Sequence, residues 1–573
     1  MPDTSLPVSS RSPDMGRRRF MAQFSLLGVG GALLPAFLLE RLQEGEKITA
    51  EMLAEAEGVL GLQFTDAERE LMLEDVNETL ESLQEIREVD IPNTVHPALS
   101  FDPVLPGRRF PAGHGSVRIS QQPGVTRPAN LEEVAFWPVV RLAELVRTRQ
   151  VSSVELAQMY LDRLKRYGPQ LECVVSLTEE LALKQARRAD AEIARGHYRG
   201  PLHGIPWGAK DLLAEDQYRT TWGAKPFEDQ VIDEDATVVA RLEEAGAVLV
   251  AKLTLGALAW GDVWFGGRTR NPWNLEQGSS GSSAGSAAAT VAGLVGFAIG
   301  SETLGSIVSP STRCGATGLR PTFGRVSRYG AMALSWSMDK LGPICRSVED
   351  CALVLDAIHG ADGKDPTARD VVFDWDPDVR LADLRIGYYK SAFDAERDDK
   401  AFDDQALVAL RSLGVDLTPI ELPDQFPVGA LRIILNVEAA AAFDELTRSN
   451  RDDLLVRQVR RAWPNVFRQS RLIPAVEYID ANRIRTMLMG ALEATLAGVD
   501  LFVTPSYGGS VLLTTNLTGH PSITLPNGFR DDGTPVSISF IGKLFGESSM
   551  MVAAKAYQDA TGFHRQQPPT FAV

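Results

Sequence analysis

In the segment PLHGIPWGAKDLL, Lys210 is the last residue of an apolar, glycine-containing run that predicts a buried strand. A lysine in such a strand is costly unless it pairs with an acid or loses its charge. An ordinary lysine, with a pKa of ~10.4, is neutral only about once in 2,500 molecules at pH 7, and lowering that pKa by ~3 units costs about 4 kcal/mol, which burial can impose. Two interpretations of Lys210 follow: a neutral base that activates a serine hydroxyl, or a structural lysine held in a salt bridge.

Serines gather downstream, in GSSGSSAGSAAATVAGLVGFAIGSETLGSIVSP (278–310). The stretch begins like a flexible linker, but its uncharged centre predicts a buried helix leading into a strand. It also contains G-x-S-x-G centred on Ser283, the pattern of a nucleophile elbow. A nucleophile elbow needs a hydrophobic strand directly before it, whereas the preceding segment here, NPWNLEQGSS, is polar. The histidine that would act as the base of such an elbow would have to be His359, His520 or His564. Besides a linker and a nucleophile elbow, a third interpretation is that these serines act together with Lys210.

Residues 137 to about 562, nearly three quarters of the chain, resemble the amidase signature family. The resemblance lies in ordered motifs: GSSAGSAAA, GSETLGSIVSP, CGATGLRPTFGRVSRYG, SMDKLGPICRSVED and NLTGHPSITLPNGF. It implies an α/β fold, with a mixed central β-sheet sandwiched between α-helices. The chain would carry an N-terminal helical segment in addition. Neither a cofactor nor a metal is expected.

The same resemblance implies a Ser–Ser–Lys triad, carried over position by position. The lysine of GIPWGAKD is Lys210, the bridging serine is Ser282, preceded by a cis peptide bond, and the nucleophile in LGSI is Ser306. The two serines lie 24 residues apart, as the family pattern expects. Ser283 is expected to support Ser282 by hydrogen bonding. The backbone N–H groups expected to hold the oxyanion are those of Thr303, Leu304, Gly305 and Ser306.

Two motifs depart from the family pattern near the nucleophile. The usual TDTGGS reads SETLGS, which places Leu304 where glycine is common, and the usual SIRIP reads SIVSP, which replaces an arginine by Val308. These changes bear on the substrate more than on catalysis. Four aromatic residues are candidates either for an acyl pocket or for ordinary core: Trp260, Trp264, Phe265 and Trp336.

The charge composition of the chain limits the kinds of molecule that it is expected to bind. Asp and Glu number 75 against 58 Lys and Arg, a net charge of −17, which disfavours sequence-independent nucleic-acid binding and favours a small-molecule or neutral polymer substrate. The family resemblance implies that this substrate is a small-molecule amide. The four cysteines form no CxxC pair and are expected to be buried free thiols. They are Cys173, Cys314, Cys345 and Cys351.

The N-terminus resembles a twin-arginine export signal. Arg17, Arg18 and Arg19 precede an apolar stretch that falls short of the ~20 residues a membrane-spanning helix needs. We therefore expect an exported protein, periplasmic or anchored in the membrane by this segment, with a cytoplasmic protein as the alternative. A homodimer is left open.

Residues 45–90 predict two helices, the second opened by Thr65 and Glu68 in capping-box spacing. FTDAERELMLEDVNETLESLQEIREVDIPNTVHPA resembles the C subunit of tRNA-dependent amidotransferases, and a generic helical hairpin is the alternative. The predicted organisation is a signal or anchor segment (1–42), a helical segment (43–103), a wrapping linker (104–136) and a catalytic domain (137–573).

Three functions compete. The first is an amidase that hydrolyses the C–N bond of a linear, non-peptide amide through a covalent acyl-enzyme. The second is a glutamine amidohydrolase like the A subunit of glutamyl-tRNA(Gln) amidotransferase. The third is a non-catalytic binding protein on the same scaffold, against which the intact Lys210, Ser282 and Ser306 argue.

Overall fold

The computed structural model describes residues 47–60, 62–89, 99, 101–113 and 115–573. The predicted export signal lies outside the described residues. The chain divides into two compact units, residues 1–77 and 78–573. Within the described parts of the chain, no helix is both long and apolar enough to cross a bilayer.

The first unit contains the two predicted helices, α3 (Ala50–Leu60) and most of α4 (Asp66–Glu88). The predicted capping box opens α4: the Thr65 backbone N–H donates to Glu68 Oε2 at 2.7 Å, and the Glu68 N–H donates to Thr65 Oγ1 at 3.3 Å. An ion pair of 2.8 Å between Arg69 and Glu57 joins the helices.

The second unit is built on an eleven-stranded sheet in the order β1-β3-β2-β8-β10-β9-β14-β15-β13-β11-β12. Its strands are β1 (Val174–Leu177), β2 (Pro206–Lys210), β3 (Val248–Leu253), β8 (Phe297–Glu302), β9 (Thr317–Arg320), β10 (Lys340–Cys345), β11 (Ile386–Tyr389), β12 (Leu417–Ile420), β13 (Leu501–Pro505), β14 (Ser522–Phe529) and β15 (Pro535–Gly542). Strand β2 runs parallel to β3 and β8, whereas β10 is antiparallel to β8 and β9. The predicted mixed sheet is confirmed.

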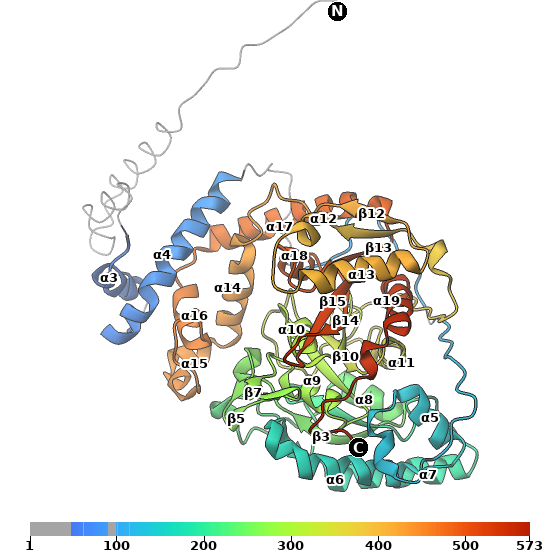
Figure 1. The fold of residues 1–573 in the computed structure, drawn as a ribbon. Coiled ribbons are helices and arrows are strands. Elements are labelled where there is room, and N and C mark those ends of the chain that lie inside the picture. The colour runs from blue at the N-terminus through green and yellow to red at the C-terminus, as the bar shows by residue number, and fades with distance from the viewer. Residues whose placement is uncertain (1–46, 61, 90–98, 100, 114) are drawn as a thin grey trace, which may run out of the picture. The chain divides into compact units, whose positions relative to one another are not determined.

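Helices pack against both faces of this sheet. The α-helices that follow α4 are α5 (Val139–Arg147), α6 (Ser153–Leu171), α7 (Glu179–Ala194), α8 (Thr237–Glu244), α9 (Ala284–Val291), α10 (Val308–Cys314), α11 (Val348–Ile358), α12 (Lys390–Asp394), α13 (Lys400–Ser412), α14 (Ile433–Ala442), α15 (Asp444–Arg448), α16 (Trp463–Ser470), α17 (Ala475–Thr495), α18 (Val511–Leu517) and α19 (Glu547–Thr561). Among them, α14 and α16 pack against each other. Figure 1 shows β10, β14 and β15 between α9 and α10 on one side and α11 and α19 on the other. Two short hairpins, β4 (Val263–Trp264) with β5 (Gly267–Arg268) and β6 (Arg270–Asn271) with β7 (Asn274–Gly278), lie outside the sheet.

The serine-rich stretch is core. Every residue of α9 and of β8 is buried, which rules out a surface linker and confirms the predicted helix followed by a strand. Small side chains are needed here, because a Cβ on Gly300 would lie 2.7 Å from Ser283 Oγ. The four cysteines are buried and free, as expected.

Candidate active site

Lys210 is the last residue of β2, which lies between β3 and β8 in the sheet, and its side chain is fully buried. Its Nζ lies within hydrogen-bond distance of three hydroxyl oxygens, at 2.8 Å from Ser282 Oγ, 3.1 Å from Ser283 Oγ and 2.8 Å from Ser301 Oγ, and it lies 3.3 Å from the Ser301 carbonyl oxygen. All of these partners are uncharged. Among the residues described, Lys210 has no ion-pair partner, so the salt-bridge interpretation does not apply to it.

Burial lowers the pKa of Lys210 well below its usual range, because the charged ammonium loses its hydration. The carboxylates of Asp339 and Glu302 act in the opposite direction, and burial outweighs them. The neighbouring strand offers a contrast in Lys252, which is equally buried but lies 3.1 Å from the carboxylate of Asp211. The structural salt bridge therefore belongs to Lys252, whereas Lys210 faces hydroxyl groups.

The two adjacent serines differ in what their hydroxyl groups do. Ser283 Oγ donates to the Ser301 carbonyl at 3.0 Å and accepts from the Ser301 N–H at 3.1 Å, so its proton is committed. Ser282 Oγ bonds to Lys210 and to no other described residue. The Gly281–Ser282 peptide bond is cis, as the resemblance implies. Ser283 does not bond directly to Ser282, and it supports the site through Lys210 and Ser301.

Ser306 lies on the turn between β8 and α10 and is 7% exposed. Its carbonyl accepts the Ser283 N–H at 3.0 Å, which brings the turn against the serine pair. No hydrogen bond joins the Ser306 and Ser282 hydroxyl groups in the part of the chain described here. Gly305 has a φ of +83°, a conformation that favours glycine.

The turn also presents unused backbone donors. Within the described structure, none of the N–H groups of the predicted oxyanion residues donates a hydrogen bond. These residues are Thr303, Leu304, Gly305 and Ser306. Free N–H groups beside a nucleophile are what a developing oxyanion needs.

Glu302, which the sequence motifs did not single out, fixes this turn. Its Oε2 accepts the N–H groups of Ile307 at 2.8 Å and Val308 at 2.9 Å, where α10 begins. Its Oε1 pairs with Arg320 at 2.8 Å and accepts from Asn516 at 2.8 Å. Although burial acts to raise it, these charged and polar partners lower the pKa of Glu302 to about 2, so the carboxylate is ionised.

Among the described residues, the three histidines proposed as partners of Ser283 form no hydrogen bond with the serine pair. His520 Nδ1 lies 2.8 Å from Thr518 Oγ1, and burial lowers the pKa of His520 to about 3. No described hydrogen bond links Ser283 to His359, His520 or His564. The nucleophile elbow therefore lacks its base.

A cavity of about 550 Å³ is lined by Ser301 and Thr303, the residues that flank Glu302. This size is ordinary for a small-molecule site. Of the four aromatic candidates, Trp336 lines the cavity. The described lining includes neither Trp260, whose ring lies 4.8 Å from the Arg457 guanidinium, nor the packed pair Trp264 and Phe265.

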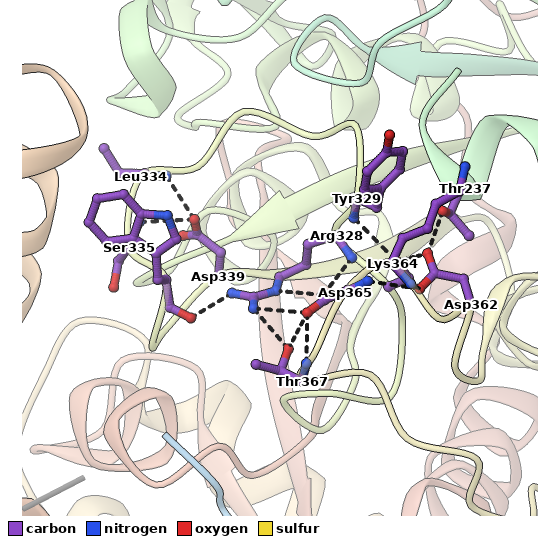
Figure 2. Close-up of polar contacts among 12 residues, drawn as sticks. Thr237, Arg328, Tyr329, Leu334, Ser335, Asp339, Asp362, Lys364, Asp365 and Thr367 are labelled. Atoms are coloured by element: carbon purple, nitrogen blue, oxygen red, sulfur yellow. Dashed lines mark hydrogen bonds and ion pairs between the residues drawn. The ribbon is translucent and has the colours of Figure 1, made fainter. Parts of the chain in front are cut away.

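Arg328 and Asp339, two charged residues that line the cavity, bond to other groups of the protein (Figure 2). Arg328 forms an ion pair of 3.1 Å with Asp365 and donates to Thr367 Oγ1 at 2.8 Å. Asp339 Oδ2 accepts the N–H groups of Leu334 at 2.8 Å and Ser335 at 2.9 Å. The charges of Arg328 and Asp339 thus hold the cavity wall together.

The chain is similar to several known proteins. The model of the amidase family matches residues 155–514. The glutamyl-tRNA(Gln) amidotransferase A subunit of Carboxydothermus hydrogenoformans is 34% identical over 76% of this chain and 99% of its own. AmiD of Mycobacterium tuberculosis, whose name assigns it to the amidases, is 36% identical over 77% of this chain and 98% of its own. The crystal structure of the native peptide amidase of Stenotrophomonas maltophilia is 32% identical, covers 77% of this chain and 100% of its own, and superposes with a TM-score of 0.69.

Proposed function

The chain belongs to the amidase family, whose members act on carbon–nitrogen bonds, and from that premise we propose that it hydrolyses linear amides other than peptide bonds through Lys210, Ser282 and Ser306. The observation that carries the proposal is the environment of Lys210. It is a buried amine with no acidic partner among the described residues, and it bonds to a serine whose proton is not committed elsewhere. Such an amine is held in the neutral, basic form that general-base catalysis requires.

The proposed first step moves two protons and forms one bond. The Ser306 proton passes to Ser282 Oγ while the Ser282 proton passes to the lone pair of the Lys210 amine. Ser306 Oγ then attacks the carbonyl carbon of the amide. Hydroxyl oxygens of Ser283 and Ser301 accept the two N–H groups that a neutral Lys210 retains, which aims its lone pair at Ser282.

The later steps return the protons. Negative charge on the carbonyl oxygen is held by the free N–H groups of the turn Thr303–Ser306. The Lys210 ammonium passes a proton back through Ser282 to the leaving amine, the C–N bond breaks, and the acyl group remains on Ser306 Oγ. Water, deprotonated by the same relay, then releases the acid and restores the enzyme.

A screen of amides tests this function. The purified single chain is expected to release ammonia from primary amides without any partner protein, measured across amides that differ in acyl length and leaving amine. Hydroxylamine is expected to divert part of the product to a hydroxamate, because it competes with water for the acyl-enzyme.

The relationship to an amidotransferase supports a second candidate, a glutamine amidohydrolase that works within a complex. The same screen separates the two. Ammonia release restricted to glutamine, and dependent on an added partner protein, would replace the proposed function by this one.

We propose that the chain is exported through its N-terminal segment, a proposal that rests on the sequence alone. Changing Arg17 and Arg18 to Lys is expected to shift the protein from the exported fraction to the cytoplasm, measured by fractionation and immunoblotting. Recovery of the wild-type protein with the membranes would indicate a retained tether. Equal export of the double variant would contradict the twin-arginine interpretation.

A further inference from the structure

Trp336 is a large aromatic side chain left half in solvent beside the candidate active site. It is 51% exposed and lines the same cavity as Ser301 and Thr303. Its neighbours Leu334, Ser335 and Ser337 are buried. An exposed indole at the wall of a substrate-sized cavity offers a flat apolar surface to whatever enters.

The segment that carries this ring is fixed on both sides by one buried carboxylate. Glu438 of α14 is 5% exposed. Its Oε2 accepts from Ser335 Oγ at 2.6 Å and from the Ser337 N–H at 3.0 Å, and its Oε1 accepts from Ser337 Oγ at 2.6 Å. Tyr478 also donates to Oε1, at 3.0 Å. The residues before and after Trp336 are therefore held in place.

Two arginines fix the backbone carbonyl groups of the same segment. Arg328 Nη1 donates to the Trp336 carbonyl at 2.7 Å, while its other nitrogens bond to Asp365 and Thr367 (Figure 2). The fully buried Arg485 donates to the Ser337 carbonyl at 2.8 Å. Hydrogen bonds to charged groups are stronger than neutral ones, so this backbone is rigid.

Asp339 links the segment to the catalytic turn. One carboxylate oxygen accepts the N–H groups of Leu334 and Ser335, and the other accepts from Thr303 Oγ1 at 2.6 Å. Asp339 thus bonds both to the segment that carries the indole and to Thr303, at the start of the turn that Glu302 also holds. A binding surface that is already ordered loses little conformational entropy when a ligand binds to it.

We propose that Trp336 is a specificity-determining residue whose indole face binds an aromatic or other large apolar group of the amide substrate. This inference rests on the proposed function. Arg328, Asp339 and Glu438, which hold the segment of the indole, bond to protein groups. Lys364 also lines the cavity; it is exposed, and its Nζ lies 4.4 Å from the Tyr329 ring. The part of the wall next to the indole therefore favours an uncharged substituent. The amide itself would lie at Ser306, and the apolar group would extend along the cavity to Trp336.

Paired substrates test the inference. 3-Phenylpropionamide is compared with propionamide for a ring on the acyl side, and acetanilide with acetamide for a ring on the amine side. In at least one series, Trp336→Ala is expected to lower kcat/KM for the aromatic amide about tenfold, mainly through KM, because the variant loses both the ring stacking and the apolar surface that the indole offers. The partner without a ring should change less than twofold.

Rescue and control variants separate binding from folding. Trp336→Phe is expected to recover most of the loss, and Val408→Ala, which removes an exposed apolar side chain from α13, should change neither substrate. Equal losses for both members of a pair, or no loss in either series, would overturn the inference while leaving the amidase function standing. A wild-type enzyme that cleaves none of the four amides would overturn the proposed function and this inference together.

Discussion

Ser306→Ala is expected to lower kcat for amide hydrolysis by at least ~10⁴-fold, because the substitution removes the oxygen that forms the acyl-enzyme. Removing the nucleophile of a serine hydrolase typically costs about 10⁶-fold in kcat, and the residual rate comes from binding and the oxyanion donors. The Ser306 backbone should stay in place, since its carbonyl accepts the Ser283 N–H and Glu302 fixes the N–H groups that follow it. The measurement is the steady-state rate with a primary amide.

Ser286→Ala is the matched control. Ser286 is a buried serine of the neighbouring helix α9, and its Oγ donates to the Ile299 carbonyl at 3.0 Å. Its loss costs a hydrogen bond, about 1 kcal/mol of stability, without touching the proposed chemistry. A fluorophosphonate probe should label the wild-type protein at Ser306. Labelling at Ser283, or an active Ser306→Ala variant, would contradict the assignment.

Local residue types were enough to predict much of this site. An apolar run that ends in lysine predicted a buried amine, and an uncharged Gly/Ser/Ala stretch predicted a buried helix and strand, and the structure has both. These predictions succeed because burial of β2 and α9 follows from their own composition. The roles of Ser282 and Ser306 came from the resemblance, since nothing local distinguishes Ser282 from Ser283.

The supports of the site could not be predicted from the sequence. Glu302 forms a hydrogen bond with Asn516, which lies 214 positions away in the sequence, and Ser337 forms one with Glu438, 101 positions away. An acid flanked by serine and threonine has no local feature that predicts a buried ion pair with Arg320. Its partners come from β9 and α18, whose positions depend on the strand order of the whole sheet.

The hydrogen bonds of the Ser283 hydroxyl group distinguish it from the hydroxyl group of Ser282. Its hydroxyl proton is held by the Ser301 carbonyl, so it cannot also protonate the lysine, whereas the Ser282 proton has no competing acceptor among the described residues. This difference is a physical reason to place Ser282, and not Ser283, next to Lys210 in the proposed relay. In the proposed relay, Ser283 transfers no proton and holds Lys210 in its orientation.

Lys210→Met is expected to lower kcat/KM by ~10²–10⁴-fold, the usual contribution of a general base, and to remove the rise of activity with pH. In the wild type only the neutral amine accepts a proton, so kcat/KM should increase as the free-enzyme ammonium deprotonates and then level off. Because burial holds the pKa of Lys210 well below its usual range, the plateau should be reached well below pH 10. The measurement is kcat/KM against pH for both proteins.

Lys340→Met tests whether this effect belongs to Lys210 or to any buried lysine. Lys340 is 2% exposed, burial lowers its pKa as well, and its Nζ has no hydrogen-bond partner in the described structure. Replacing it by an apolar side chain of similar length should leave the pH profile of the wild type intact, since it bonds to no serine.

A Lys210→Met variant that keeps the rising limb would show that another group is the base. Loss of the rising limb in Lys340→Met would show that the pH dependence of kcat/KM comes from the stability of the fold and not from the titration of Lys210. Only the pair of results in which Lys210→Met flattens the profile and Lys340→Met preserves it assigns the titrating group to the amine that contacts Ser282.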